Sequence, residues 1–236
     1  MKLAVLSEKR DYEKRVAATP ETVQKIISLG LEVFVESGAG NGAQIMDKHY
    51  EESGAIIFSD QSNLKDVDII IKVQRPIKEL ECTNLKKNSI LVGLLDPFSD
   101  IEQINQYAKD HITAISLEFV PRITRAQSMD VLSSQSNLAG YKSVLEAANE
   151  YGKAMPMMMT AAGTIAPAKV FVLGAGVAGL QAIATAKRLG AVVYASDVRK
   201  SAAEQIESVG GRFIEVDGMD DFEDESGYAK PLTPEF

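Results

Sequence analysis

The chain has 236 residues, a length that suits one or two domains. Hydrophobic residues make up 45% and charged residues 25% of it, so there is enough apolar side chain to exclude disorder over the whole length. Its 25 Lys and Arg against 33 Asp and Glu give a net charge of −8, which argues against a nucleic-acid-binding protein. One cysteine and two histidines argue against a disulfide framework and against a Cys/His zinc site.

Nothing in the sequence indicates a membrane-spanning segment. No run approaches the roughly 20 consecutive apolar residues that a spanning helix needs. The apolar start of the chain, Met1–Leu6, is too short for a signal peptide and is followed at once by charges. We expect no membrane span in this chain, although it could dock on a membrane protein.

Short β-branched runs alternate with helical patterns through the first half of the chain. Thr19-Pro20-Glu21 is typical of a helix start, with Thr as N-cap and Pro at the first helical position, and Gly30 stands where a C-terminal glycine belongs. Val67–Val73 and Ile90–Leu94 are continuous apolar runs, typical of strands buried on both faces. Further predicted strands are Leu3–Leu6, Leu31–Val35, Ala55–Phe58 and His111–Leu117, and further predicted helices are Met46–Ser53 and Ile101–Ala108. This alternation predicts a parallel sheet covered on both sides.

A long helix, Ser134–Tyr151, breaks this rhythm and is interpreted as joining two lobes. The methionines that follow, in Pro156–Thr160, are interpreted as flexible core packing between the lobes. The second lobe starts at Lys169. Its predicted strands are Val170–Leu173, Val192–Ala195 and Arg212–Val216, and its predicted helices are Val177–Leu189 and Ser201–Val209.

The predicted fold is α/β with two parallel-sheet lobes. Residues 1–133 form an N-terminal flavodoxin-like or Rossmann-like domain, and residues 134–164 a connecting helix and linker. Residues 165–236 supply the first half of a Rossmann domain, which stops after its third strand, with an acidic loop or tail from Asp217. The missing half would then lie on another polypeptide, or the chain is truncated.

A glycine fingerprint opens the second lobe. Gly174-Ala175-Gly176-Val177-Ala178-Gly179 follows a predicted strand and begins a predicted helix, the context that makes G-x-G-x-x-G a strong signal. Gly174 permits the tight turn, Gly176 lets the backbone approach a pyrophosphate, and Gly179 lets the helix pack on the strand. The N–H groups at the helix start then bind the diphosphate.

The next predicted strand leads into Asp197-Val198-Arg199. Asp197 lies at the expected distance, about 20 residues after the first glycine. A carboxylate there accepts hydrogen bonds from both hydroxyls of the adenosine ribose and repels a 2′-phosphate, so we expect a preference for NAD(H) over NADP(H). Arg199 and Lys200 lie nearby and could accommodate a phosphate, which leaves the preference open.

With these residues in hand, the chain resembles the NAD(H)-binding domain I, from the α subunit, of proton-translocating NAD(P) transhydrogenases. The likeness covers nearly all of the chain, and its Arg-Ala-Gln-Ser-Met-Asp stretch, Arg125–Asp130, is highly specific. The motifs that carry it are Arg15–Pro20, Glu36–Gly40, Pro121–Tyr141, Pro156–Thr164 and Gly179–Ala191.

The resemblance implies roles for a set of polar residues. Arg122 would contact the phosphates or carboxamide region of NAD(H), while Gln127, Asp130 and Ser133 would orient the nicotinamide and its ribose. Tyr228 would fold over the bound nucleotide as a lid. Direct hydride transfer between two nicotinamides needs such positioning and needs no acid–base pair.

The resemblance also implies partners. NADP(H) would bind to a separate domain, and proton movement would go through a membrane domain. The chain itself would be a homodimer, attached peripherally on the cytoplasmic side of the bacterial inner membrane.

Two alternatives remain open. Alanine dehydrogenase shares the two-lobed architecture, and its pattern is matched at Arg15 and Lys72, but Asp96 stands where that family has its catalytic histidine. The two histidines present, His49 and His111, are interpreted as structural or solvated, so a general base for amino-acid oxidation is missing. The other alternative is a half-domain that is inactive without a partner.

Overall fold

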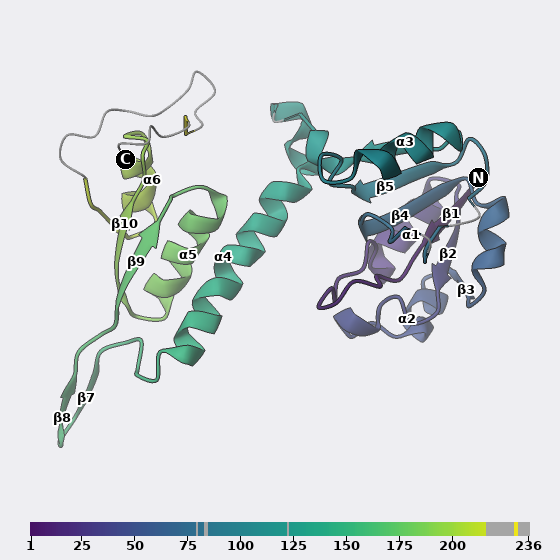
Figure 1. Ribbon diagram of the computed structural model, residues 1–236. Helices are drawn as coiled ribbons and strands as arrows, with labels where there is room; N and C mark the ends of the chain where they lie inside the picture. The colour runs from purple at the N-terminus through teal and green to yellow at the C-terminus, as the bar shows by residue number, and fades with distance from the viewer. Residues whose placement is uncertain (79, 83–84, 122, 216–228, 231–236) are drawn as a thin grey trace. The chain divides into compact units, whose positions relative to one another are not determined.

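The computed structural model describes residues 1–78, 80–82, 85–121, 123–215 and 229–230 (Figure 1). The chain divides into two compact units, Met1–Asp130 and Val131–Phe236.

The first unit is built on a six-stranded parallel sheet with the strand order β3-β2-β1-β4-β5-β6. This is the order of a complete doubly wound dinucleotide-binding sheet, and its topological switch point lies between β1 and β4. The strands are β1 (Lys2–Val5), β2 (Glu32–Glu36), β3 (Ile56–Phe58), β4 (Ile69–Gln74), β5 (Ile90–Leu94) and β6 (Thr113–Ser116).

Besides the strands, the described residues of this unit form three α-helices and four 3₁₀ turns, of which the last two follow β6. The predicted start of α1 is confirmed, because the Thr19 side chain accepts a hydrogen bond from the Thr22 N–H and Pro20 is the first helical residue. The helices are α1 (Pro20–Ser28), α2 (Asp47–Glu52) and α3 (Ile101–Lys109), and the 3₁₀ turns are η1 (Asn41–Ala43), η2 (Gln61–Asp66), η3 (Leu117–Phe119) and η4 (Thr124–Met129).

Both faces of this sheet are buried, as the apolar strands predict. Successive side chains of a strand point to opposite faces. Leu3 and Val5 of β1 belong to one core cluster, which includes Val23 of α1. Ala4 and Leu6 belong to a second cluster on the other face. The prediction of a parallel sheet covered on both sides is therefore confirmed.

The second unit holds a three-stranded parallel sheet with the order β11-β10-β9. Its strands are β9 (Lys169–Leu173), β10 (Val192–Ser196) and β11 (Arg212–Phe213), and its helices are α4 (Val131–Glu150), α5 (Val177–Arg188) and α6 (Ala202–Ser208). Figure 1 shows α4 running beside α5. The helix α4 begins before its predicted start at Ser134.

The two faces of this sheet differ in exposure. Val170 and Val172 of β9 pack into the core cluster beneath α5. Their alternate neighbours on β9 are exposed, Phe171 at 53% and Leu173 at 81%. In the part of the chain that the structure describes, the helices therefore cover one face of the sheet only.

The methionine cluster is not core, and that prediction is wrong. It lies on an antiparallel hairpin of β7 (Met158–Thr160) and β8 (Gly163–Ile165), which projects from the rest of the second unit in Figure 1. Met157 is 56% and Met159 is 76% exposed. Pairing in a two-stranded ribbon satisfies the backbone here but leaves the side chains without a covering layer.

Candidate functional site

The glycine fingerprint forms the turn between β9 and α5. Gly174 has a φ of +87°, a conformation that side chains other than glycine rarely adopt. Its N–H donates to the carbonyl oxygen of Ser196 at 2.9 Å, which ties the turn to β10. A Cβ placed at Gly179 would overlap the carbonyl oxygen of Gly174. The turn therefore needs glycine at both positions for reasons of the fold.

Gly176 is different, because the backbone itself does not need a glycine there. It is the N-cap of α5 with a φ of −72°, and as a glycine it brings no side chain to cap the helix. A Cβ placed on it would meet no atom of the described residues within 4 Å. The first N–H groups of an α-helix have no partner within the helix, so this open space faces free donors and a positive dipole end. That environment fits a diphosphate.

Asp197 follows β10 and reaches back to this turn. Its Oδ2 accepts from the backbone N–H of Ala175 at 2.6 Å. Its Oδ1 accepts from the backbone N–H and the Nε of Arg199, each at 2.9 Å, and Arg199 Nη2 donates to Oδ2 at 3.1 Å. The structure thus joins three predicted residues, Ala175, Asp197 and Arg199, in one hydrogen-bonded group.

This group holds the carboxylate in its charged form. Only 6% of the Asp197 side chain and 14% of the Arg199 side chain are exposed. Burial alone would raise the pKa of Asp197, but the hydrogen bonds from Arg199 and Ala175 outweigh it and keep that pKa below its usual value. Val198 and Lys200 are the neighbours on either side of Arg199 in the chain.

The predicted nicotinamide-side residues lie where η4 ends and α4 begins. Gln127 is exposed on η4, and its carbonyl accepts from the Asp130 N–H at 3.2 Å. Asp130 and Ser133 are both partly buried. Arg122 and Tyr228 lie outside the described residues, so their predicted roles are carried by the sequence alone.

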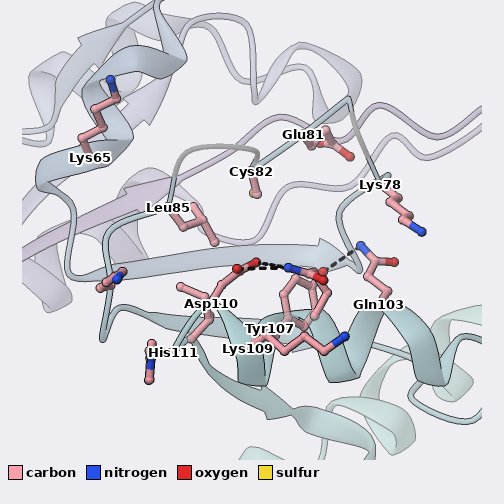
Figure 2. A pocket seen from close by; sticks show the side chains of 13 residues that line it. Lys65, Lys78, Glu81, Cys82, Leu85, Gln103, Tyr107, Lys109, Asp110 and His111 are labelled. Atoms are coloured by element: carbon pink, nitrogen blue, oxygen red, sulfur yellow. Dashed lines mark hydrogen bonds between the residues drawn. The ribbon is translucent and has the colours of Figure 1, made fainter.

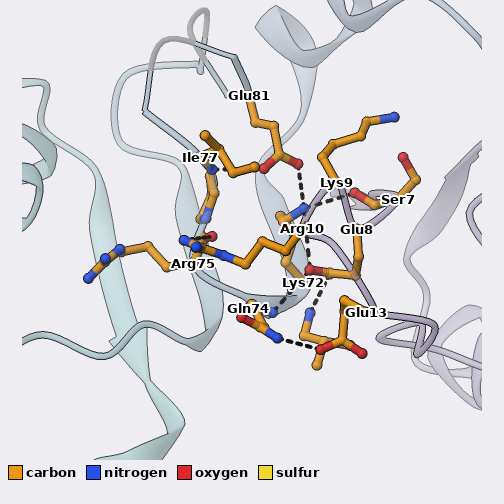
Figure 3. A network of polar contacts seen from close by, with 12 residues as sticks. Ser7, Glu8, Lys9, Arg10, Glu13, Lys72, Gln74, Arg75, Ile77 and Glu81 are labelled. Atoms are coloured by element: carbon orange, nitrogen blue, oxygen red, sulfur yellow. Dashed lines mark hydrogen bonds and ion pairs between the residues drawn. The ribbon is translucent and has the colours of Figure 1, made fainter. Parts of the chain in front are cut away.

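A buried ionic cluster that the sequence did not reveal lies at the carboxyl ends of β1 and β4 (Figure 3). Lys72 Nζ donates to Glu81 Oε1 at 2.5 Å and to the Ser7 carbonyl at 2.8 Å, and it lies 3.6 Å from Glu8 Oε2. The three charged side chains are at most 2% exposed. Burial raises the pKa of Glu8, against the opposing effects of Lys72 and the backbone N–H groups of Val73 and Gln74.

Arg15, the other cation that matches the dehydrogenase pattern, is also paired within the chain. Its Nε donates to Glu13 Oε1 at 2.8 Å, and its Nη2 lies 2.6 Å from Glu13 Oε2. Gln74 adds a bond to the same carboxylate. The bond from Arg15 is the main cause that lowers the pKa of Glu13 to about 2. Arg15 and Lys72 are therefore each paired with a carboxylate of the same chain.

A cavity of about 640 Å³ lies in the first unit, away from all of these groups except Glu81 (Figure 2). Two pairs of its polar lining residues bond to each other, since Gln103 donates to Tyr107 at 2.8 Å and Gln106 donates to Asp110 at 3.0 Å. Burial raises the pKa of Cys82, which also lines it, to about 12, so the thiol is protonated. The described residues that line the cavity include none of the predicted nucleotide-binding residues.

Within the described ranges, no helix combines the length and apolar character needed to cross a membrane. The same residues hold no group of three or more His, Cys, Asp or Glu side chains placed to share a metal ion.

The chain matches two family models in succession. Residues 4–139 match the N-terminal domain of alanine dehydrogenase/PNT, and residues 143–230 match its C-terminal domain.

Individual relatives favour the transhydrogenase branch. The first part of the NAD(P) transhydrogenase subunit alpha of Rhodospirillum rubrum is 51% identical over all of this chain and 63% of its own length. The crystal structure of transhydrogenase from Sinorhizobium meliloti superimposes with a TM-score of 0.89 at 50% identity, over 92% of this chain and 62% of that one. Alanine dehydrogenase 2 of Staphylococcus aureus is 32% identical over 90% of this chain and 57% of its own length.

This chain therefore spans less than two thirds of the length of these relatives. The resemblance to transhydrogenase α subunits and the α/β fold class are confirmed, and alanine dehydrogenase is the more distant relative. The chain belongs to the alanine dehydrogenase/PNT family.

Proposed function

We propose that this chain is the NAD(H)-binding component of a proton-translocating NAD(P) transhydrogenase. It binds NADH and passes hydride to NADP⁺, which is held on a separate domain. The observation that carries the proposal is the glycine turn hydrogen-bonded to Asp197, in a chain 51% identical to a section of a transhydrogenase α subunit.

The residues divide the work of holding the dinucleotide. The N–H groups at the start of α5 would bind the pyrophosphate in the open space beside Gly176. Asp197 would accept the ribose hydroxyls of the adenosine half, and its negative charge disfavours a 2′-phosphate. Val177 and Val198 flank these two contacts in the chain. The bound dinucleotide supplies the hydride chemistry, and the protein supplies position and the exclusion of water.

The reaction explains why the proposed residues include no general base. A hydride leaves C4 of NADH with both electrons and arrives at C4 of NADP⁺, so NAD⁺ and NADPH form and no proton is exchanged with a side chain. Rate then depends on holding two rings in contact. We assign Gln127, Asp130 and Ser133 to the nicotinamide and its ribose, Arg122 to the phosphates or carboxamide region, and Tyr228 to the lid.

We further propose the assembly that this role needs. The partners are an NADP(H)-binding domain and a membrane domain that carries the proton. The chain acts as a homodimer, peripheral on the cytoplasmic side of the bacterial inner membrane.

Calorimetric titration of the full subunit tests the nucleotide assignment. NADH should bind at least about tenfold more tightly than NADPH, since a buried carboxylate facing a 2′-phosphate costs more than about 1.4 kcal/mol. Asp197→Asn should remove most of that preference. Equal or reversed affinities in the unaltered protein would overturn the assignment.

Asp130→Asn tests the division between binding and transfer. In the complex with its partner domain, hydride transfer from NADH to NADP⁺ should slow far more than NADH binding weakens, because a positioning contact matters most in the transition state. Equal losses would mean that Asp130 contributes general affinity. Turnover of pyruvate and ammonia with NADH would instead support the dehydrogenase alternative.

A further inference from the structure

The carboxylate of Asp197 is saturated by donors from its own chain. A carboxylate offers about four lone-pair positions, two on each oxygen. Oδ1 accepts from Arg199 N and Arg199 Nε, and Oδ2 accepts from Ala175 N and Arg199 Nη2, at 2.6–3.1 Å. With these four bonds in place, the carboxylate has no acceptor position left for a ribose hydroxyl.

The four donors are not equivalent. Ala175 N and Arg199 N are backbone groups fixed by the turn and by the end of β10. The Arg199 Nε and Nη2 belong to one side chain, which can change rotamer while the fold stays unchanged. If that side chain moves away, one acceptor position opens on each carboxylate oxygen. A ribose with free 2′- and 3′-hydroxyls brings two donors, one for each position.

We propose that the Arg199 side chain occupies the diol-binding positions of Asp197 in the unliganded chain, and that the adenosine ribose binds by exchanging with it. This inference rests on the proposed function and adds a residue that sets nucleotide affinity and specificity. The guanidinium covers the carboxylate until two ribose hydroxyls replace its two hydrogen bonds to Asp197, and the longer bond of 3.4 Å from Nη2 to the Ala175 carbonyl is given up in the same exchange. It also offsets part of the charge that repels a 2′-phosphate, so the preference for NADH is smaller with Arg199 present than without it. Arg199 is a positioning residue here, acting through Asp197.

The exchange lowers the affinity that the site would otherwise have. The form competent to bind the diol is only a fraction of the free protein, and the apparent affinity falls by that fraction. Removing the guanidinium should therefore strengthen NADH binding. Loss of a positive charge would by itself weaken the binding of an anionic dinucleotide. An increase in NADH affinity would therefore point to the exchange and not to the change in charge.

The test uses Arg199→Met in the full subunit, because methionine retains much of the aliphatic stem that packs beside Asp197. Calorimetric titration should show NADH binding strengthened by roughly fivefold, the scale of one or two charge-assisted hydrogen bonds partly offset by solvation. The 2′-deoxy analogue of NADH, which lacks one of the two hydroxyls, should gain less. NADPH should bind more weakly than it does to the unaltered protein, because its phosphate then faces an uncompensated Asp197.

Lys9→Ala is the matched control. Lys9 pairs with Glu36 at 3.1 Å in the first unit, where Glu36 also accepts from a loop N–H, so the same kind of contact is removed outside the nucleotide site. NADH affinity should not change in this variant. Arg199→Ala serves as a second variant, and thermal unfolding with circular dichroism shows that each variant is folded.

Weaker or unchanged NADH binding in folded Arg199→Met would overturn the exchange, and so would an equal gain for NADH and its 2′-deoxy analogue. These outcomes differ from a failure of the proposed function. If the unaltered subunit binds neither NADH nor NADPH, the nucleotide assignment itself falls. If it binds NADH and Asp197→Asn weakens that binding, the assignment holds whatever Arg199 does.

Discussion

Each of the two units contains the same kind of hydrogen bond between an acid and a loop N–H, but the surroundings of that bond differ. In each unit, a carboxylate at the end of one strand (β2 or β10) accepts a hydrogen bond from a backbone N–H that follows the neighbouring strand (β1 or β9). Ser7 N donates to Glu36 Oε2 at 2.9 Å in the first unit, and Ala175 N donates to Asp197 Oδ2 at 2.6 Å in the second. In each unit a nearby cation, Lys9 or Arg199, pairs with that carboxylate.

The two units differ in the segment that connects the first strand to the first helix. After β9, the glycine turn passes directly into α5, so free N–H groups and open space meet at Gly176. After β1, the chain runs through residues 6–19 before α1 begins, and this loop contributes to the buried ionic cluster around Lys72. An acid at the end of the second strand is therefore common to both units, and the glycine turn distinguishes the unit to which we assign the proposed dinucleotide site.

The largest effect should come from Lys72→Met, which tests whether the centre of the first unit is structural. The substitution leaves the carboxylates of Glu8 and Glu81 buried without their cation. We expect the free energy of unfolding to fall by about 3–5 kcal/mol, the usual cost of breaking a buried ion pair from one side. The loss should be smaller near pH 5 than at pH 8, because burial raises the pKa of the Glu8 carboxyl, which can then take up a proton in the folded state.

Urea unfolding followed by circular dichroism measures this loss. Lys86→Met is the control, since its bond to Asp68 joins side chains that are 44% and 27% exposed. It should cost no more than about 1 kcal/mol. If the two variants lose equal stability, the buried ion pairs of Lys72 contribute no more to the stability of the first unit than an exposed pair does.

The next effect concerns the glycine turn. Gly179→Ala should lower the stability of the second unit by about 1–3 kcal/mol, because the new methyl overlaps the Gly174 carbonyl oxygen and backbone must shift. Nucleotide binding should fall with it. Thermal unfolding of the full subunit, with and without NADH, separates the two losses.

Gly176→Ala is the matched variant in the same turn. Its methyl meets no atom of the described chain within 4 Å, and a φ of −72° suits alanine. Stability should change by less than about 0.5 kcal/mol, while NADH binding weakens by about tenfold or more because the methyl fills the diphosphate space. A destabilised Gly176→Ala that still binds NADH would reverse the roles we give to these two glycines.

The glycine turn and the acid of the second unit can be predicted from the sequence, because each depends on residues close together in the chain. Gly174 and Gly179 each have a backbone reason to be glycine, and Asp197 stands at a fixed spacing, so all three are visible without a structure. The cluster of Glu8, Lys72 and Glu81 was not visible, because it joins segments far apart in the chain and each residue alone is an ordinary surface type.

Two other features could not be predicted from the sequence, each for a different physical reason. The methionines of Pro156–Thr160 are apolar enough for a core, and only the pairing of β7 with β8 places them on an exposed hairpin. The sequence identifies Arg199 as a cation near the predicted ribose site. Its bonds to Asp197 depend on a rotamer and a turn geometry that residue identity does not fix.

A smaller effect is the pH dependence of the pair between Glu13 and Arg15. The pKa of Glu13 is lowered to about 2 in the folded chain, from an ordinary value of 4.5. The unfolded chain therefore binds more protons in this interval, and the stabilisation from Glu13 is complete above pH 4.5 and is lost as pH falls towards 2. Glu13→Gln should lose stability less steeply than the unaltered protein over this range.

Urea midpoints measured from about pH 5 downward give these slopes. Glu21→Gln is the control, because Glu21 pairs with Lys25 between side chains that are 76% and 72% exposed. Its slope should differ little from that of the unaltered protein. Parallel slopes for Glu13→Gln and the unaltered chain would show that the Glu13 carboxylate titrates alike in both states.

The smallest effect is expected for Lys9→Ala, and it bears most directly on the comparison of the two acids. The Lys9 side chain is 39% exposed, so its bond to Glu36 is largely solvated, and Glu36 retains the N–H of Ser7 when the lysine is gone. Stability should fall by less than about 1 kcal/mol. A loss well above that, measured by urea unfolding, would make the cation a structural part of this contact in the first unit. The Arg199–Asp197 pair could then be structural in the same way. Only an increase in NADH affinity in Arg199→Met would show that Arg199 is displaced by the ribose.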